Sequence, residues 1–301
     1  MIETWTLAAV SITAAAELAV QDRHGLVSVS SSTARWFRQS AAALAGYLER
    51  DVGVEELTPL EVSRWVRDGV ERGLSPVSVN SRLRAIKTIY SRLERNGVVG
   101  FNPAGPVPFV PEPPKRPKAI AEADYMAMRA AAGCARDVAI LDVLWSSGCR
   151  LGGLLSMRVD RMERWTRDGR ECFAFLVVEK FSRPRWVYVG RDALQAAALA
   201  VWLAERPPVD VWLWPAFAFP FGQMAASTVE SVVRRLRLAA GIPRERPASV
   251  HSFRHAFAIR MLDDGEDIAA VSAWLGHHSP AFTAEVYAIR SERLLREKYF
   301  G

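Results

Sequence analysis

The chain has 301 residues, of which 50% are hydrophobic and 24% charged, with 39 Lys and Arg against 33 Asp and Glu. This composition is typical of a folded protein and excludes a disordered tail or a fibre. The length predicts two domains, and the net charge of +6 is compatible with a polyanionic partner but does not identify one.

The compartment follows from the cysteines and the apolar segments. Three cysteines without CxxC spacing indicate neither a disulfide framework nor a cysteine zinc site, which favours a reducing cytoplasm. The longest apolar stretch, residues 193–204, is shorter than the ~20 residues that a membrane span needs. Residues 1–29 are apolar at first but contain Glu3 and Glu17, so we expect an N-terminal arm or an extra helix rather than a secretory signal.

Residues 30–102 are expected to form a small helical domain. Amphipathic periodicity predicts helices over 32–50, 58–72 and 75–96, and Thr58 with Glu61 is typical of a capping box. The third helix has a basic face that could contact DNA, although an ordinary solvated face would have the same pattern. The candidate DNA-binding residues on it are Arg82, Arg84, Lys87 and Arg92.

A proline-rich linker is predicted over residues 103–117. The stretch 102–117 contains seven prolines and shows neither a helical nor a strand period. Residues 1–114 contain 12 basic and 12 acidic residues, whereas the remainder contains 27 and 21. The whole net charge therefore belongs to the second part of the chain.

Residues 118–301 are expected to form a mostly helical domain with a small antiparallel sheet. Residues 173–178 and 186–189 are rich in β-branched and aromatic residues, and residues 179–185 between them indicate the tip of a hairpin. Helical periodicity covers most of the rest and ends in a short tail helix. The predicted helices are 121–132, 135–147, 151–157, 192–204, 226–240, 252–263, 268–275 and 291–299.

Four of the five histidines fall between His251 and His278. His251 and His255 have the spacing of two zinc ligands on a helix, but Arg254 stands between them, and a guanidinium beside a dication is unfavourable. The sequence therefore predicts no metal. His251 and Arg254, three residues apart on one helix face, instead suit a phosphate group.

The order of these residues resembles that of the tyrosine recombinase (phage integrase) family. His251 and Arg254 stand in the motif HSFRH, and His277 ends the motif LGH. Tyr287 follows His277 by ten residues, as the nucleophilic tyrosine does in this family. SGCRLGGLL resembles the first family motif and supplies Arg150. EKFSRPRWVYV corresponds to the hairpin that carries a lysine, here Lys180, and residues 74–104 resemble the helical, SAM-like core-binding domain of the family.

The resemblance implies a mechanism. Arg150 and Arg254 would bind the non-bridging phosphate oxygens, and His277 would donate a hydrogen bond to the phosphate. Tyr287 would form a 3′-phosphotyrosine after losing its proton to His251. Lys180 would protonate the departing 5′ oxygen. His255 would only support the site.

The resemblance also implies a function and partners. We expect a site-specific recombinase that needs no cofactor and acts as a homotetramer on double-stranded DNA with inverted-repeat sites, with accessory proteins as further partners. Gly153 stands where the family commonly has an acidic residue, so a DNA-binding protein with impaired catalysis is one alternative. A type IB topoisomerase or a telomere resolvase is another, but the compact length favours a recombinase.

Overall fold

The computed structural model describes residues 10–21, 29–113, 118–178, 184–208, 210–216, 222–276 and 299. The chain divides into two compact units, Met1–Pro114 and Lys115–Gly301. Each unit is built around its own hydrophobic core. Within the described ranges, no helix is long and apolar enough to cross a membrane.

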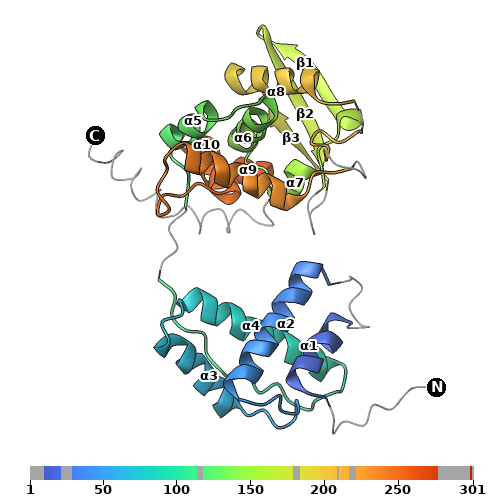
Figure 1. Ribbon diagram of the computed structural model, residues 1–301, viewed down its shortest axis with the longest axis vertical. Coiled ribbons are helices and arrows are strands. Elements are labelled where there is room, and N and C mark those ends of the chain that lie inside the picture. The colour runs from blue at the N-terminus through green and yellow to red at the C-terminus, as the bar shows by residue number, and fades with distance from the viewer. Residues whose placement is uncertain are drawn as a thin grey trace, which may run out of the picture. The chain divides into compact units, whose positions relative to one another are not determined.

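The first unit is a helical bundle (Figure 1). Its helices are α1 (Ile12–Val20), α2 (Ser31–Tyr47), α3 (Pro59–Glu71) and α4 (Pro76–Arg95). The capping box at the start of α3 forms as predicted, because the Thr58 hydroxyl accepts from the Glu61 backbone and the Glu61 carboxylate accepts from the Thr58 backbone. The apolar faces of the helices meet in one core.

Helix α1 belongs to the core of this unit. Ile12, Ala15, Ala16 and Ala19 are all buried, and the helix packs on α2 and α4. Its small side chains allow close approach to the neighbouring helices. The described part of the segment predicted as an arm or extra helix is therefore a helix that contributes to the bundle.

Much of the predicted linker packs on the first unit rather than forming a free spacer. The Asn80 side chain on α4 donates to the Val110 carbonyl and accepts from the Val110 backbone, each at 2.8 Å. Ala104 and Val107 are buried in the bundle core. The apolar residues between the prolines explain this difference, since they bury surface that a linker would leave in water.

The second unit is mostly helical. Its helices are α5 (Glu122–Ala130), α6 (Ala135–Ser147), α7 (Leu151–Leu155), the 3-10 turn η2 (Val159–Arg161), α8 (Ala193–Glu205), α9 (Ala226–Ala239), α10 (Val250–Asp263) and α11 (Ile268–Leu275). Helix α6 is central, because its residues from Ala139 to Ser147 are all buried and it contacts α5, α8, α9 and α10. The buried position of α6 therefore fixes the place of the turn that follows Ser147.

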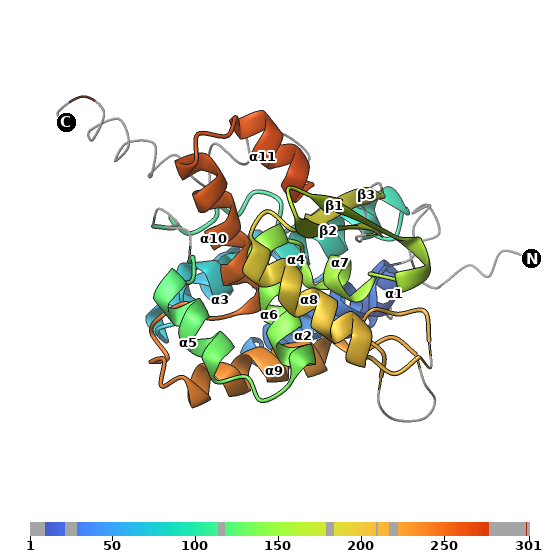
Figure 2. The same cartoon turned by 90° about the horizontal axis from the view of Figure 1, so that it is seen from above.

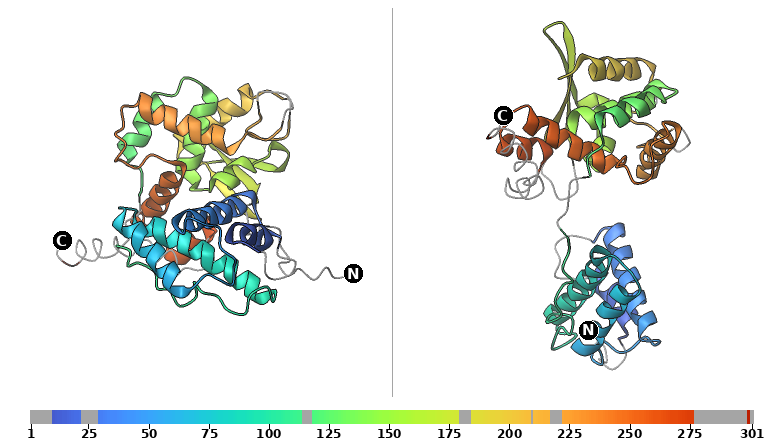
Figure 3. Two further views of the ribbon diagram at one scale, coloured as in Figure 1. Left: turned by 60° about the horizontal axis from the view of Figure 1, so that its bottom comes forward. Right: turned by 90° about the vertical axis from the view of Figure 1, so that its left-hand side faces the viewer.

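A three-stranded antiparallel sheet completes this unit, in the order β1 (Met162–Arg167), β2 (Arg170–Val177), β3 (Arg185–Val189). Helix α8 lies beside the sheet in two views and contacts β2 (Figures 2 and 3). The predicted pair of strands, β2 and β3, and the mainly helical fold with a small antiparallel sheet are confirmed. Strand β1 was not predicted, because almost all its residues are exposed and it lacks an apolar face. The tip of the predicted hairpin and the predicted tail helix lie almost wholly outside the described residues.

Candidate active site

Arg150 is delivered by the turn that ends α6. Gly148 follows the helix in the left-handed conformation, at φ +58°, and Arg150 is the N-cap residue of α7. A Cβ on Gly148 would lie 2.6 Å from the Phe257 ring of α10. Only glycine fits this close approach without strain, so the turn holds the backbone before Arg150 against α10.

Arg254 is buried, with 3% of its surface exposed, and is more enclosed than either Arg150 or His251. Its guanidinium donates to the Gly148 carbonyl at 3.0 Å and to the Leu275 carbonyl at 2.7 Å. A buried charge is tolerated when such hydrogen bonds compensate for lost hydration. Arg254 thereby connects the turn before Arg150 with the end of α11.

His251 lies in the first turn of α10, on the same helix face as Arg254. The start of this helix is fixed by a capping box in which the Ser249 and Ser252 side chains bond to each other's backbone N–H groups. The His251 ring meets the ring of His255 edge to face, with 4.7 Å between the centroids. The cap therefore places His251 one turn before the buried arginine.

One pocket of about 540 Å³ joins these residues. Arg150, which lies about 100 residues earlier in the sequence, lines it together with His251 and Arg254 of α10. Its other lining residues are Cys149, Leu151, Glu230, Val233, Arg234, Arg237, Ala248, Ser249 and Val250. The remaining predicted catalytic residues, Lys180, His277 and Tyr287, lie outside the described residues.

His251 in the pocket and His255 beside it are held in the neutral form. Partial removal from water lowers the pKa of His251, and the charges of Arg254 and Arg150 lower it further. Burial is also the main cause that lowers the pKa of His255 to about 4, with smaller contributions from His251 and Arg254. At neutral pH the His251 imidazole is therefore free to accept a proton.

Helix α9 supplies pocket residues that the sequence prediction missed. Glu230, Val233, Arg234 and Arg237 follow the i, i+3, i+4, i+7 spacing of one helix face, and all four line the pocket. This spacing was present in the sequence and could have identified a face with two arginines. It could not have shown that the face points to the same pocket as Arg254.

The basic residues predicted on α4 all belong to the first unit. Arg84 is exposed, and Arg84 and Lys87 lie over the Phe109 ring at 5.2 and 4.9 Å from its centroid. Arg92 donates to the Ala19 carbonyl at the end of α1. Arg82 lines a small hollow beside Trp65 and Gly69. Arg92 therefore also stabilises the bundle.

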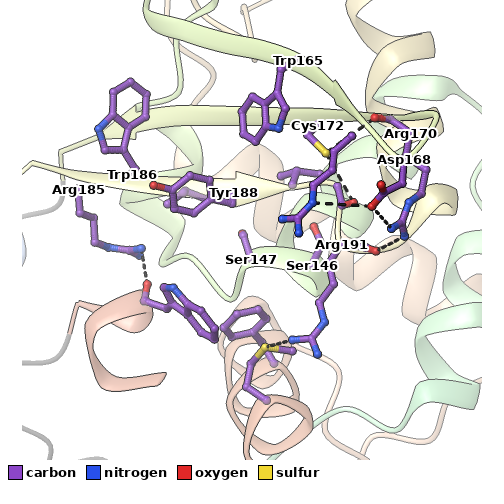
Figure 4. A pocket seen from close by; sticks show the side chains of 17 residues that line it. Ser146, Ser147, Trp165, Asp168, Arg170, Cys172, Arg185, Trp186, Tyr188 and Arg191 are labelled. Carbon is purple, nitrogen blue, oxygen red and sulfur yellow. Dashed lines mark hydrogen bonds and ion pairs between the residues drawn. The ribbon is translucent and has the colours of Figure 1, made fainter. Parts of the chain in front are cut away.

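The described residues contain no group of three His, Cys, Asp or Glu side chains that could hold a metal ion. A larger hollow, of about 680 Å³, lies over the open face of the sheet. Figure 4 shows Trp165, Trp186 and Tyr188 on this side, with Arg185 at its edge. Of the predicted catalytic residues within the described ranges, Arg150, His251 and Arg254, none lines this hollow.

Comparison with known proteins identifies the class. Residues 118–293 match the model of the phage integrase family. A tyrosine recombinase XerC of Chromohalobacter salexigens is 30% identical over 283 residues, covering 90% of this chain and 89% of the relative. The chain therefore belongs to the phage integrase family, and it is a site-specific recombinase of the tyrosine type.

Solved structures support the same fold. A lambda integrase dimer bound to a COC′ core site has a TM-score of 0.69 at 15% identity, covering 92% of this chain and 77% of that one. A lambda integrase tetramer bound to a Holliday junction has a TM-score of 0.68 at 15% identity, covering 91% and 80%. At this identity the likeness concerns the fold alone.

Proposed function

We propose that the pocket formed by Arg150, His251 and Arg254 binds the scissile phosphate of a DNA strand. The observation that carries this proposal is that Arg150, from the turn after α6, lines one cavity together with Arg254 and the neutral His251, both from α10. Guanidinium groups cannot lose their charge in proteins, so they supply a fixed positive potential. Backbone carbonyls hold both arginines before any substrate arrives.

The chemistry is a transfer of the phosphodiester to Tyr287. The tyrosine oxygen attacks phosphorus, the bond to the 5′ oxygen breaks, and a 3′-phosphotyrosine forms. A tyrosine with a pKa of ~10 is only about one part in a thousand ionised at neutral pH, a deficit of roughly 4 kcal/mol. His251 removes the tyrosine proton, and Lys180 returns a proton to the 5′ oxygen, so no net charge accumulates.

The arginines stabilise the five-coordinate phosphorus, on which extra negative charge develops. Loss of one such donor typically lowers the rate about 100-fold to 1000-fold. His277 donates a further hydrogen bond to the phosphate. Gly153 offers Arg150 no acidic side chain, and the hydrogen bonds from Arg150 to the Gly276 carbonyl contribute to its positioning.

We assign the units as follows. Residues 30–102 are the core-binding domain and contact DNA through the basic residues of α4, and residues 118–301 are the catalytic domain with a C-terminal tail helix. Four copies act on two inverted-repeat sites, as the tetrameric assembly of lambda integrase on a Holliday junction suggests. The reaction needs no cofactor, since the phosphotyrosine conserves the energy of the broken bond.

The test is capture of the covalent intermediate. A binding site is first enriched from random inverted repeats around a short spacer, with the Tyr287→Phe variant as bait so that the DNA stays intact. A nick beside the scissile phosphate in the enriched duplex then lets the short strand diffuse away and traps the adduct. We expect wild-type protein, but not Tyr287→Phe, to form a 3′ adduct that migrates with the protein in a denaturing gel.

Two outcomes would contradict the proposal. Binding without an adduct from wild-type protein would indicate a DNA-binding protein without the reaction. An adduct followed only by relaxation of supercoiled DNA, without exchange between two sites, would indicate a topoisomerase.

A further inference from the structure

Three arginines from three elements converge on the end of α11. The carbonyls that accept their hydrogen bonds are those of Trp274, Leu275 and Gly276. Arg185 of β3 donates to the Trp274 carbonyl at 2.5 Å, and Arg254 of α10 donates to the Leu275 carbonyl at 2.7 Å. Arg150 donates to the Gly276 carbonyl through two nitrogens, each at 3.4 Å. The last carbonyls of a helix lack partners in the helix and carry partial negative charge, so they suit cations.

Two of these arginines line the pocket proposed for the phosphate, whereas Arg185 does not. Arg185 instead reaches from the first residue of β3 to the helix end, as the dashed line in Figure 4 shows. Gly276 ends α11 at φ +64°, and a Cβ there would lie 2.9 Å from Arg185 Nε. The guanidinium therefore packs against the backbone that also holds Arg150.

The end of α11 is a shared support for the two phosphate-binding arginines. The apolar face of α11 buries Val271 and Leu275 against Phe257 and Met261 of α10. This packing joins α11 to α10 but not to the sheet. Arg185 supplies a hydrogen bond between the sheet and the helix end.

We propose that Arg185 is a positioning residue for the reaction, which holds the end of α11 where its carbonyls orient Arg150 and Arg254 toward one phosphate. The inference rests on the proposed function of the pocket. Arg185 acts through the other two arginines, so its loss impairs the neutralisation of phosphate charge and not DNA binding as such. A displacement of about 1 Å in a positioned group can lower a rate about 100-fold.

The chemical consequence separates this role from a general structural one. A methylphosphonate at the scissile position replaces one charged non-bridging oxygen with a methyl group. This linkage is uncharged, so it depends much less on correctly placed guanidinium groups. A variant that only misplaces the arginines loses activity on phosphate and far less on methylphosphonate.

The experiment compares single-turnover adduct formation on the enriched nicked duplex with either linkage. We expect Arg185→Ala to react about 10-fold to 100-fold more slowly than wild type on phosphate and within about threefold of it on methylphosphonate. Arg185→Lys, which keeps one donor for the Trp274 carbonyl, should recover part of the loss on phosphate. The affinity of both variants for the duplex should match that of wild type.

Two variants calibrate the measurement. Arg150→Ala removes a phosphate-binding arginine and should show the same preference for methylphosphonate. Arg167→Ala, at the exposed end of β1 where the side chain pairs with Asp168 at 3.8 Å, should resemble wild type on both linkages.

The outcomes distinguish the two proposals. No adduct from wild-type protein on either linkage would overturn the proposed function and this inference with it. With wild type active, equal losses of Arg185→Ala on both linkages, or no loss on phosphate, would overturn the inference alone. If Arg185→Ala does not fold, Arg185→Lys is measured against the same two criteria.

Discussion

The surroundings of His251 and His255 set the protonation state of both side chains. Both rings lie on α10 beside Arg254, and the pKa of each is lowered below the ordinary value of 6.5. Arg150 faces His251 from the turn after α6 and contributes to its shift. A protonated imidazole would add a further positive charge next to two arginines, so the folded chain favours the neutral rings.

This arrangement makes stability depend on pH. Because the folded-state pKa of each histidine is lowered, the unfolded chain binds more protons in acid. The stabilisation is fully present above the unfolded value of 6.5 and is lost as the pH falls from there toward about 4, the folded value for His255. We expect the free energy of unfolding to fall by up to about 1.4 kcal/mol per pH unit as His255 titrates in this range, with a contribution of the same sign from His251.

Urea unfolding at several pH values measures the effect. The His255→Asn variant cannot titrate at this position, so its free energy of unfolding should fall less steeply between pH 6.5 and 4 than that of wild type. The carboxylates are the same in both proteins and do not affect the difference. Parallel curves would show that the His255 pKa is not lowered by folding.

The sequence predicted which residues line this pocket better than it predicted how they are held. Spacing placed His251 and Arg254 on one helix face, and the structure confirms that face. Arg254 donates to the Gly148 and Leu275 carbonyls, which are 106 and 21 residues away in the sequence. Periodicity could not predict these hydrogen bonds, because they depend on tertiary packing. Arg185 was missed for the same reason.

At the scale of elements, the end of α6 joins the core to the pocket. The Gly148 carbonyl accepts from Arg254, and its Cα lies against Phe257. Gly148 therefore ends a helix, fits a tight contact and supports the guanidinium of Arg254. Gly241, after α9, has a similar φ of +66° but open space where a Cβ would be.

We expect alanine at these two glycines to have different effects. Gly241→Ala should lower the free energy of unfolding by about 1–2 kcal/mol, from left-handed backbone strain alone. Gly148→Ala should lower it by about 1–3 kcal/mol more, because the new Cβ overlaps Phe257. It should also slow adduct formation, since the shift moves the Gly148 carbonyl away from Arg254.

Chemical denaturation of the two variants measures the difference, and adduct formation by Gly241→Ala is the activity control. Equal destabilisation by both substitutions would mean that the Phe257 side chain moves aside for the new Cβ at little cost in free energy. The close approach would then not position the turn.

The helices were largely predictable because their periodicity and caps are local. The bounds of α6 and α11 match the prediction, and most other helix ends differ by one to three residues. Strand β1 was missed, yet Asp168 and Gly169, both at positive φ, form the turn before β2. An Asp-Gly pair is a strong hairpin signal. The residues of β1 show no alternation of apolar and polar side chains, so hydrophobic periodicity did not indicate a strand there.

At the scale of the whole molecule, the net charge of each unit is a poor guide to which unit would bind DNA. The first 114 residues have no net charge, whereas the remainder accounts for the +6 of the chain. The first unit nevertheless has its own core and the basic residues of α4. A domain with balanced charge can bind a polyanion if its positive residues share one face and its acidic residues lie elsewhere.

We therefore expect residues 1–114 alone to fold and to bind a duplex of arbitrary sequence, with log K falling linearly with log salt concentration. The slope should be about 0.9 for each phosphate neutralised. Arg84→Ala, which removes an exposed cation of α4, should reduce the slope by about that amount. Arg72→Ala, which removes an exposed arginine paired with Asp68 at the end of α3, should not change it. Fluorescence anisotropy at several salt concentrations measures the slopes, and equal slopes for the two variants would place the DNA contact elsewhere than on α4.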